Sequence, residues 1–277
     1  MKYILLVLLP LFVLSSCDEP VRLDPNQSAS RIIIEGQVTN KPGYQYVKVS
    51  RSGGFYETGK TPKVTNAFVL VKDDLGNEYP FTHNPGNKND SVGYYLPSVS
   101  FEGQIGRTYH LSVDLDEQRY EAEDKLYSVT SIDSLSYQVN EDEKDDPEDV
   151  GKFYEVLLFA QEPQGTNDYY LFKFYRNDSL KVYNDTEIYF ADDEILGESI
   201  DGVSSPIYFA PGDLARVEMY SISRTAFVFY TDLQNLLNSD GGLFSQPPSN
   251  SRTNLSNGAL GFFQASALDI SSVEIKE

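Results

Sequence analysis

The single cysteine of this 277-residue chain, Cys17, restricts how the chain can be stabilised. A lone cysteine forms no disulfide within a chain, so each domain must be held together by its own apolar core. Cys17 closes the segment LSSC at 14–17, after a basic Lys2 and an apolar stretch at 3–14. A basic start, a short apolar run and small residues before a cut are typical of an export signal. The apolar stretch is shorter than the roughly 20 residues that a spanning helix needs.

The segment looks like a bacterial lipoprotein signal peptide over 1–16, with Cys17 lipidated and as the mature N-terminus. A plain signal peptide with a chance cysteine, or an N-terminal core helix, is the alternative. Asp18 and Glu19 come next and open a polar, acidic tether over 17–30. Such an acidic pair resembles the signal that sends Bacteroidota lipoproteins to the outer face of the outer membrane. Retention at the inner membrane, or plain solvated charges, are the other interpretations.

Charge limits the partners. The chain has 42 acidic and 22 basic side chains, a formal charge of −20. Nucleic acid and anionic lipid headgroups repel such a body, so no nucleic-acid partner is expected and a lipid must provide the membrane anchor. The 20 tyrosines and 16 phenylalanines favour strands over helices. We therefore predict a mainly all-β fold with two β-sandwich-like domains, the second with one short α-helix.

Residues 31–127 are predicted to form the first β-sandwich. Strands are expected at 31–38, 46–49, 64–71, 79–81, 94–96 and 106–115. In the last strand the apolar side chains alternate with polar ones, so Tyr109, Leu111, Val113 and Leu115 should share the inner face. The order of these strands and their glycines resembles carboxypeptidase-regulatory-like and transthyretin-like modules, which are seven-stranded sandwiches without catalysis of their own.

Residues 128–277 are predicted to form the second β-rich domain, with strands at 131–137, 153–159, 167–175 and 215–222. The strand at 167–175 is apolar on both faces, which indicates a central strand covered on each side. The acidic run at 140–149 is expected at a solvated hairpin tip.

A helix is predicted at about 223–238 of the second domain. Ser223 can cap its start, and Gly241 with Gly242 can end it. Its apolar side chains recur at three- and four-residue steps and should pack on the sheet: Phe227, Tyr230, Leu233 and Leu237.

Several segments together resemble one family. They are the lipoprotein signal, Ile34-Glu35-Gly36, the strand at 106–109, Asp168-Tyr169-Tyr170 and the segment GALGFF at 258–263. On these the chain is identified as a member of the Bacteroidota lipoproteins described as domain-of-unknown-function family 4249. The resemblance covers essentially the whole mature chain. It implies an envelope location and a β-rich fold, in bacteria rich in TonB-dependent transporters, and it implies no established activity.

No catalytic constellation is visible, so no enzyme, cofactor or metal is predicted. There is no Gly-x-Ser-x-Gly, and the only cysteine is assigned to lipid. His83 and His110 are interpreted as surface residues without zinc-site spacing. Calcium at the acidic run, through Asp145, Asp146, Glu148 and Asp149, is a weaker alternative to a solvated tip.

Two sets of residues are candidates for contacts with other molecules. Four aromatic residues lie around the glycine-rich loop at 50–59 and could stack on sugar rings or anchor a partner, although packing is the alternative: Tyr44, Tyr46, Phe55 and Tyr56. Three serines follow an Asp and precede an apolar residue, a pattern similar to Bacteroidota O-glycosylation sites: Ser91, Ser134 and Ser179.

The expected function is that of a surface-exposed outer-membrane lipoprotein acting as a non-enzymatic accessory or interaction protein, alongside a TonB-dependent transporter. The alternative is a glycan- or peptide-binding surface module. A hydrolase using a carboxylate pair is the third interpretation.

Overall fold

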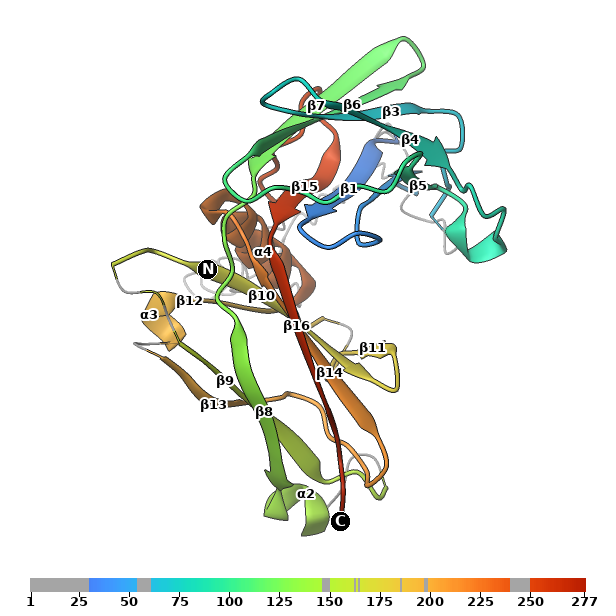
Figure 1. Cartoon of the computed structure of the whole chain (residues 1–277). Coiled ribbons are helices and arrows are strands. Elements are labelled where there is room, and N and C mark those ends of the chain that lie inside the picture. Colours follow the sequence, from blue (N-terminus) through green and yellow to red (C-terminus); the bar gives the residue numbers. More distant parts are fainter. Residues whose placement is uncertain are drawn as a thin grey trace, which may run out of the picture.

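The computed structural model describes residues 30–53, 61–145, 150–161, 163, 165–184, 186–196, 199–239 and 250–277. Within these ranges the chain is mainly β, as predicted, and its strands form two domains (Figure 1).

The first domain is one eight-stranded sheet in the order β15-β1-β2-β5-β4-β3-β6-β7. Its strands are β1 (Ile32–Thr39), β2 (Tyr46–Arg51), β3 (Phe68–Asp73), β4 (Glu78–His83), β5 (Tyr94–Pro97), β6 (Thr108–Leu115), β7 (Gln118–Lys125) and β15 (Leu260–Ser266); η3 (Asn89–Ser91) is a short 3-10 turn. The sheet curls round one apolar core, and the predicted inner face of β6 is confirmed, because Tyr109, Leu111, Val113 and Leu115 are all buried there.

The predicted boundary at residue 127 is wrong for β15, because this strand pairs in parallel with β1 of the first domain. Ile33 lies beside Leu260, and the register continues to Thr39 beside Ser266. Residues 250–266 therefore return to the first domain after the chain has built most of the second. A pairing between such distant segments leaves no trace in local periodicity.

Gly261 makes this pairing possible. Its φ is +96°, and a Cβ atom there would collide with the backbone oxygen of Ile34. Only glycine combines this conformation with so close an approach of two strands. The close approach of β15 to β1 thus explains why the second glycine of the GALGFF segment, Gly261, is a glycine.

The second domain is a sandwich of two sheets. One sheet runs β11-β10-β14-β16, with β12 also paired to β10, and the other runs β13-β9-β8. Their strands are β8 (Ile132–Val139), β9 (Tyr154–Gln161), β10 (Tyr169–Arg176), β11 (Ser179–Lys181), β12 (Tyr189–Asp192), β13 (Ser199–Ser204), β14 (Leu214–Ser221) and β16 (Leu268–Glu274); α3 (Asp193–Leu196) follows β12. Side chains of β9, β10, β13 and β14 fill the core between the sheets.

Strand β10 is covered on both faces, as its sequence predicted. Tyr170, Phe172 and Phe174 point into the core of the sandwich. Leu171 belongs to a second cluster on the opposite face, where Tyr220 and the helix pack.

The predicted helix is confirmed as α4 (Arg224–Leu237). The Ser223 hydroxyl accepts a hydrogen bond from the Ala226 N–H at 3.2 Å, a cap worth about 1 kcal/mol. Phe227 and Tyr230 pack into the cluster that links the helix to the sheet, as expected. The expectation for Leu237 is wrong: it is 41% exposed, because it is the last residue of the helix.

The acidic run begins at the tip of the hairpin that β8 and β9 form, as predicted. Its described part is a one-turn helix, α2 (Glu141–Asp145), without buried residues. Asp145 is exposed, and Asp146, Glu148 and Asp149 lie outside the described residues.

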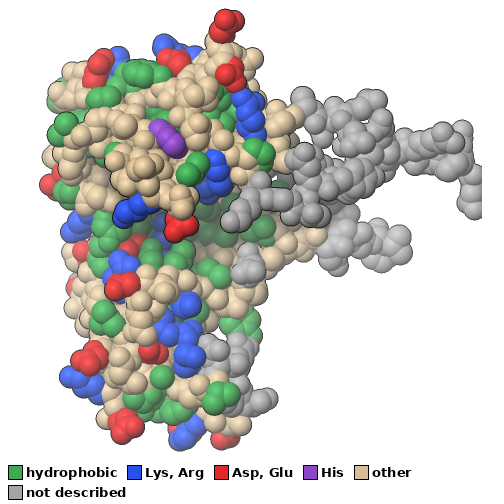
Figure 2. Space-filling view, turned by 90° about the vertical axis from the view of Figure 1, so that its right-hand side faces the viewer, with side chains coloured by type: hydrophobic (Ala, Val, Ile, Leu, Met, Phe, Trp, Pro, Cys, Tyr) green, Lys and Arg blue, Asp and Glu red, His purple; other side chains and the backbone are tan. Residues whose placement is uncertain are grey.

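The two domains meet at α4, which lies between the first sheet and the second domain (Figure 1). The chain crosses the junction at Tyr127 and again at Ala267, beside Ser221. There the Ser221 N–H donates to the Ala267 carbonyl and its hydroxyl to the Tyr127 carbonyl, both at 3.0 Å. In the side view the surface is hollowed between the domains, with hydrophobic side chains at the bottom of the hollow (Figure 2).

Candidate functional site

The residues predicted for anchoring and export are Cys17, Asp18 and Glu19, and they lie outside the described residues. Phe55 and Tyr56 of the predicted contact loop also lie outside them. Their roles stay predictions, whereas Tyr44, Tyr46 and the three serines can be placed.

The three predicted glycosylation serines differ in access. Ser134 on β8 and Ser179 at the start of β11 are exposed, and Ser91 in η3 is half-buried. Ser179 follows a tight turn in which Asn177 and Asp178 both have positive φ. Two of the three hydroxyls are therefore open to a modifying enzyme.

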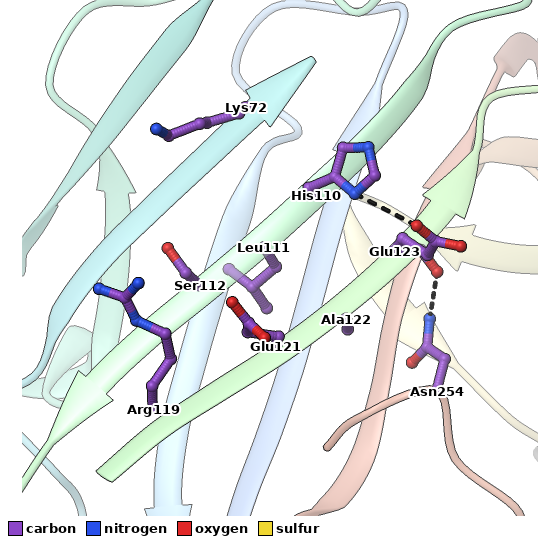
Figure 3. Close-up of a pocket in the computed structure, with 9 residues that line it drawn as sticks. All are labelled: Lys72, His110, Leu111, Ser112, Arg119, Glu121, Ala122, Glu123 and Asn254. Atoms are coloured by element: carbon purple, nitrogen blue, oxygen red, sulfur yellow. Dashed lines mark hydrogen bonds and ion pairs between the residues drawn. The ribbon is translucent and has the colours of Figure 1, made fainter. Parts of the chain in front are cut away.

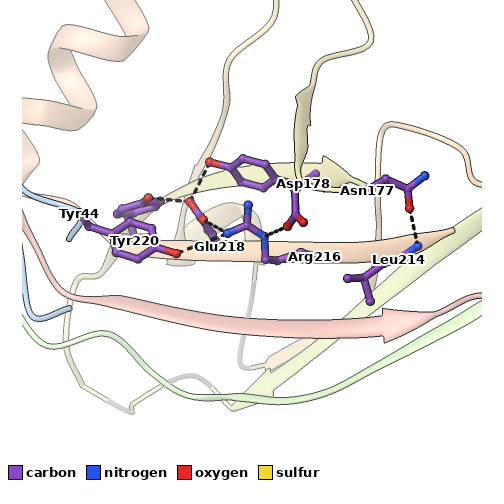
Figure 4. A network of polar contacts seen from close by, with 8 residues as sticks. Tyr44, Asn177, Asp178, Leu214, Arg216, Glu218 and Tyr220 are labelled. Atoms are coloured by element: carbon purple, nitrogen blue, oxygen red, sulfur yellow. Dashed lines mark hydrogen bonds and ion pairs between the residues drawn. The ribbon is translucent and has the colours of Figure 1, made fainter. Parts of the chain in front are cut away.

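Tyr44 does not lie on an open patch but joins a polar network at the domain junction (Figure 4). It lies on the first-domain segment between β1 and β2, and its hydroxyl hydrogen-bonds the Glu218 carboxylate of β14. The Arg216 guanidinium also donates to the Tyr44 hydroxyl, at 3.4 Å. Tyr44 is thus a contact between the two domains.

Glu218 is the centre of this network and is 1% exposed. Its carboxylate accepts from the Tyr220 hydroxyl at 2.7 Å, the Tyr175 hydroxyl at 3.0 Å and Arg216 Nη1 at 2.7 Å. Burial, followed by the Glu218 charge, raises the pKa of both tyrosine hydroxyls well above the usual range. The hydroxyls therefore stay protonated and remain donors to Glu218.

Two cations on this sheet lie over aromatic rings. The Arg216 guanidinium carbon is 3.9 Å from the centre of the Tyr175 ring, and Lys173 Nζ is 4.6 Å from that of Tyr220. Burial lowers the pKa of Lys173, while the charge of Glu218 opposes that shift. A ring face attracts a cation most strongly where water is excluded, so these contacts stabilise the pairing of β10 with β14 in the second domain.

Sequence reasoning did not predict Lys173, Arg216 or Glu218. The signal was present, because Lys173 and Glu218 are charges inside largely apolar strands and face each other across β10 and β14. A charge in a covered strand needs a partner. Pairing between those strands, which identifies the partner, comes only from the fold.

Tyr46 lies on the outer face of the first sheet with side chains of β1, β2, β5 and β15. We call this set the Tyr46 face; its members are Glu35, Gln37, Tyr46, Lys48, Tyr94 and Gln264. Lys48 Nζ is 2.8 Å from the Glu35 carboxylate and 5.7 Å from the centre of the Tyr94 ring. The rings of Tyr46 and Tyr94 are 5.9 Å apart.

Helix α4 flanks the Tyr46 face along β15. Phe229 of the helix packs against Phe262, with ring centres 5.1 Å apart. The Tyr230 hydroxyl donates to the Gln264 Oε1 at 2.8 Å. Burial raises the pKa of Tyr46 and of Tyr230, and the Glu35 charge adds to both shifts. The Tyr230 hydrogen bond and the Phe229 ring contact place the helix beside the same face of the sheet.

A separate hollow of about 510 Å³ lies on the outer face of β6 and β7 (Figure 3). His110 Nδ1 is 3.2 Å from the Glu123 carboxylate, and Asn254 donates to the Glu123 backbone oxygen at 2.9 Å. Arg119, at the other end of the hollow, pairs with Asp114 at 2.6 Å. His110 is thus on the polar face that the sequence predicted.

The second histidine has a structural role. His83 Nε2 accepts a hydrogen bond from the Gly93 N–H at 3.0 Å and packs beside Tyr95. Within the described ranges no three His, Cys, Asp or Glu side chains are grouped so that they could hold a metal ion. Nor does any described helix combine the length and the apolar character needed to cross a membrane.

Fold and site together define a two-domain, mainly β protein with polar and aromatic groups gathered at the domain junction and on one sheet face. The chain belongs to the family described as domain of unknown function (DUF4249), which matches residues 18–269. No curated protein matches the chain. A solved structure titled "Cytokine receptor complex - Crystal form 1A" is 8% identical, covering 88% of this chain and 95% of that chain, and its TM-score of 0.26 supports no argument.

Proposed function

We propose that this chain is a surface-exposed outer-membrane lipoprotein that acts as a non-enzymatic interaction protein. The observation that carries the proposal is the LSSC segment at 14–17, followed by a polar tether that leads to β1 at Ile32. A body with a formal charge of −20 has no electrostatic attraction to anionic membranes, so the lipid on Cys17 supplies the anchor. Asp18 and Glu19 direct it to the outer face.

A TonB-dependent transporter is the proposed partner. The network around Glu218 and the α4 contacts support a stiff body in which the two domains present one surface. A stiff surface loses little conformational freedom when it binds, which favours stable association.

Affinity capture tests this proposal. The tagged full chain is recovered from detergent-solubilised outer membranes, and bound proteins are identified by mass spectrometry. A large outer-membrane transporter should be enriched over the same preparation from cells with an untagged chain. Recovery of the chain without any outer-membrane protein contradicts the proposal.

The predicted contact loop can be tested in the same assay. Phe55→Ala with Tyr56→Ala should weaken partner capture by roughly 1–4 kcal/mol, because aromatic anchors dominate interfaces. Val99→Ala, at a 77% exposed apolar residue elsewhere in the first domain, is the matched control. A large loss of melting temperature in the double variant would assign both rings to the core.

A second candidate function is direct capture of a small ligand. The Tyr46 face favours it, because two tyrosine rings, a paired acid and base and two amides gather there. Sites with this mixture of ring faces and hydrogen-bonding groups recognise polar ligands.

A further inference from the structure

The Tyr46 face is built on interior strands. β1 pairs with β15 on one side and β2 on the other, and β2 also pairs with β5. The backbone N–H and C=O groups of β1 and β2 are therefore used within the sheet. A peptide that binds by strand addition needs an unpaired edge, so this face can recognise a ligand only through its side chains.

The charges of the Tyr46 face cancel. Glu35 and Lys48 form an ion pair at 2.8 Å, with their side chains 46% and 22% exposed. The rest of the face consists of two tyrosines and two glutamines, which are uncharged at neutral pH. The protein as a whole has a formal charge of −20 and repels anions. The face therefore suits a ligand without net charge.

A buried donor points to hydrogen bonding at this face. Gln264 is 4% exposed, and its Oε1 accepts from the Tyr230 hydroxyl at 2.8 Å. Its Nε2 has no acceptor among the residues that the structure describes. Buried amide N–H groups nearly always have a partner. Gln264 shares a row of the sheet with Gln37 and Tyr46, so its free donor belongs to the same side as the rings.

Ring faces and hydrogen-bonding groups together match one class of ligand. The two tyrosine rings, 5.9 Å apart and inclined at 50°, offer apolar surface on which the C–H face of a sugar can stack. The Glu35 carboxylate accepts from hydroxyl groups, and the Lys48 ammonium donates to them. We propose that the Tyr46 face binds a neutral oligosaccharide. This names the ligand class for the second candidate function and rests on it.

Binding to immobilised sugars tests the inference. The purified full chain is applied to neutral hexasaccharides of β-1,3-glucan, α-1,4-glucan, β-1,4-xylan and β-1,4-mannan, with hexagalacturonate as an acidic probe. At least one neutral hexasaccharide should bind, and hexagalacturonate should not. Binding to no neutral hexasaccharide, or a preference for the acidic one, overturns the inference.

Variants assign the binding to this face. Tyr94→Ala and Glu35→Gln should each weaken binding of the neutral sugar at least tenfold, as measured by calorimetry. Glu121→Gln, on the outer face of β7 in the separate hollow, is the matched control and should bind normally. Equal binding by all three variants overturns the assignment. A melting curve is recorded for each variant to check that it folds. Glu35→Gln keeps the side-chain volume, so it still tests the assignment if Tyr94→Ala does not fold.

The sugar-binding test and the transporter-capture test can fail independently of each other. A chain that captures a transporter from outer membranes and binds no neutral hexasaccharide contradicts only the ligand inference. A chain that binds such a sugar but captures no outer-membrane protein contradicts the accessory role and retains the inference.

Discussion

The Asp124 carboxylate on β7 accepts a hydrogen bond from the Ala265 N–H on β15, at 2.9 Å. These strands are the two ends of the eight-stranded sheet, so the contact joins the ends of the curled sheet. The capping residue of α4, Ser223, also hydrogen-bonds this carboxylate. One buried acid thus connects the closure of the first domain to the start of the helix at the junction.

This acid should make stability depend on pH. Burial raises the pKa of Asp124 to about 7, against an ordinary value of 3.8. Between these values the folded chain holds a proton that the unfolded chain has lost, so the contribution is fully present below about pH 4 and is lost as pH rises through about 7. The predicted loss is at most about 4 kcal/mol.

Asp124→Asn tests that prediction by urea unfolding at pH values from 4 to 8. The variant should lack the decline, so the difference in unfolding free energy between the parent and the variant changes with pH. Asp114→Asn is the control, because the Arg119 hydrogen bond lowers the pKa of Asp114 and its contribution is lost only towards acid pH. Parallel profiles for the parent and Asp124→Asn would contradict the account.

The Glu218 network should be essential to the second domain. Glu218→Ala removes the carboxylate that the Arg216 guanidinium and the hydroxyls of Tyr44, Tyr175 and Tyr220 hydrogen-bond. Removing one partner of a buried charge pair costs about 3–5 kcal/mol. Glu274→Ala on β16, where the side chain is 61% exposed, should change the unfolding free energy by less than about 1 kcal/mol. If Glu218→Ala and Glu274→Ala change the free energy of chemical unfolding equally, the Glu218 network is not essential to stability.

Gly261 and Gly258 provide a paired test of the β1–β15 contact. Both have positive φ, but an added Cβ at Gly258 lies 3.8 Å from the nearest atom, whereas at Gly261 it meets the Ile34 backbone. Gly258→Ala should cost about 1 kcal/mol from strain alone, and Gly261→Ala about 3 kcal/mol or more. If the two variants lose the same stability in thermal melting, the close approach of β1 and β15 is not the reason that a glycine is needed at 261.

The sequence predicted those parts of the fold that have a local pattern. The alternation in β6, the two apolar faces of β10 and the Ser223 cap of α4 were all confirmed. Strand β7 was missed, because its exposed face carries charges at alternate positions and its inner face includes Asp124. Charged strands of this kind lack the apolar content that distinguishes a strand from a loop.

The candidate site depended on pairings that only the fold provides. Tyr46 could be named from its position beside a glycine-rich loop, but Gln264 reaches the same face through the parallel pairing of β15 with β1. Tyr44 was named as a contact residue, and its described contact is with Glu218 across the junction. Separations of this length lie beyond any window in which periodicity can be recognised.

The acidic pair after Cys17 should determine the side of the membrane. Protease added to intact cells should degrade the protein, and Asp18→Ala with Glu19→Ala should protect it by leaving it inside the outer membrane. A periplasmic protein followed in the same samples reports whether the cells stayed intact. Survival of the unaltered protein in intact cells would contradict surface exposure.

The anchor itself is tested most directly by fractionation of Cys17→Ser. With lipid as the anchor and a body at a formal charge of −20, the variant should leave the membrane pellet and appear in the soluble fraction, while the parent stays in the outer membrane. Metabolic labelling with a fatty acid should mark the parent and not the variant. Cys17→Ser that still sediments with the outer membrane after a high-salt wash would contradict the account.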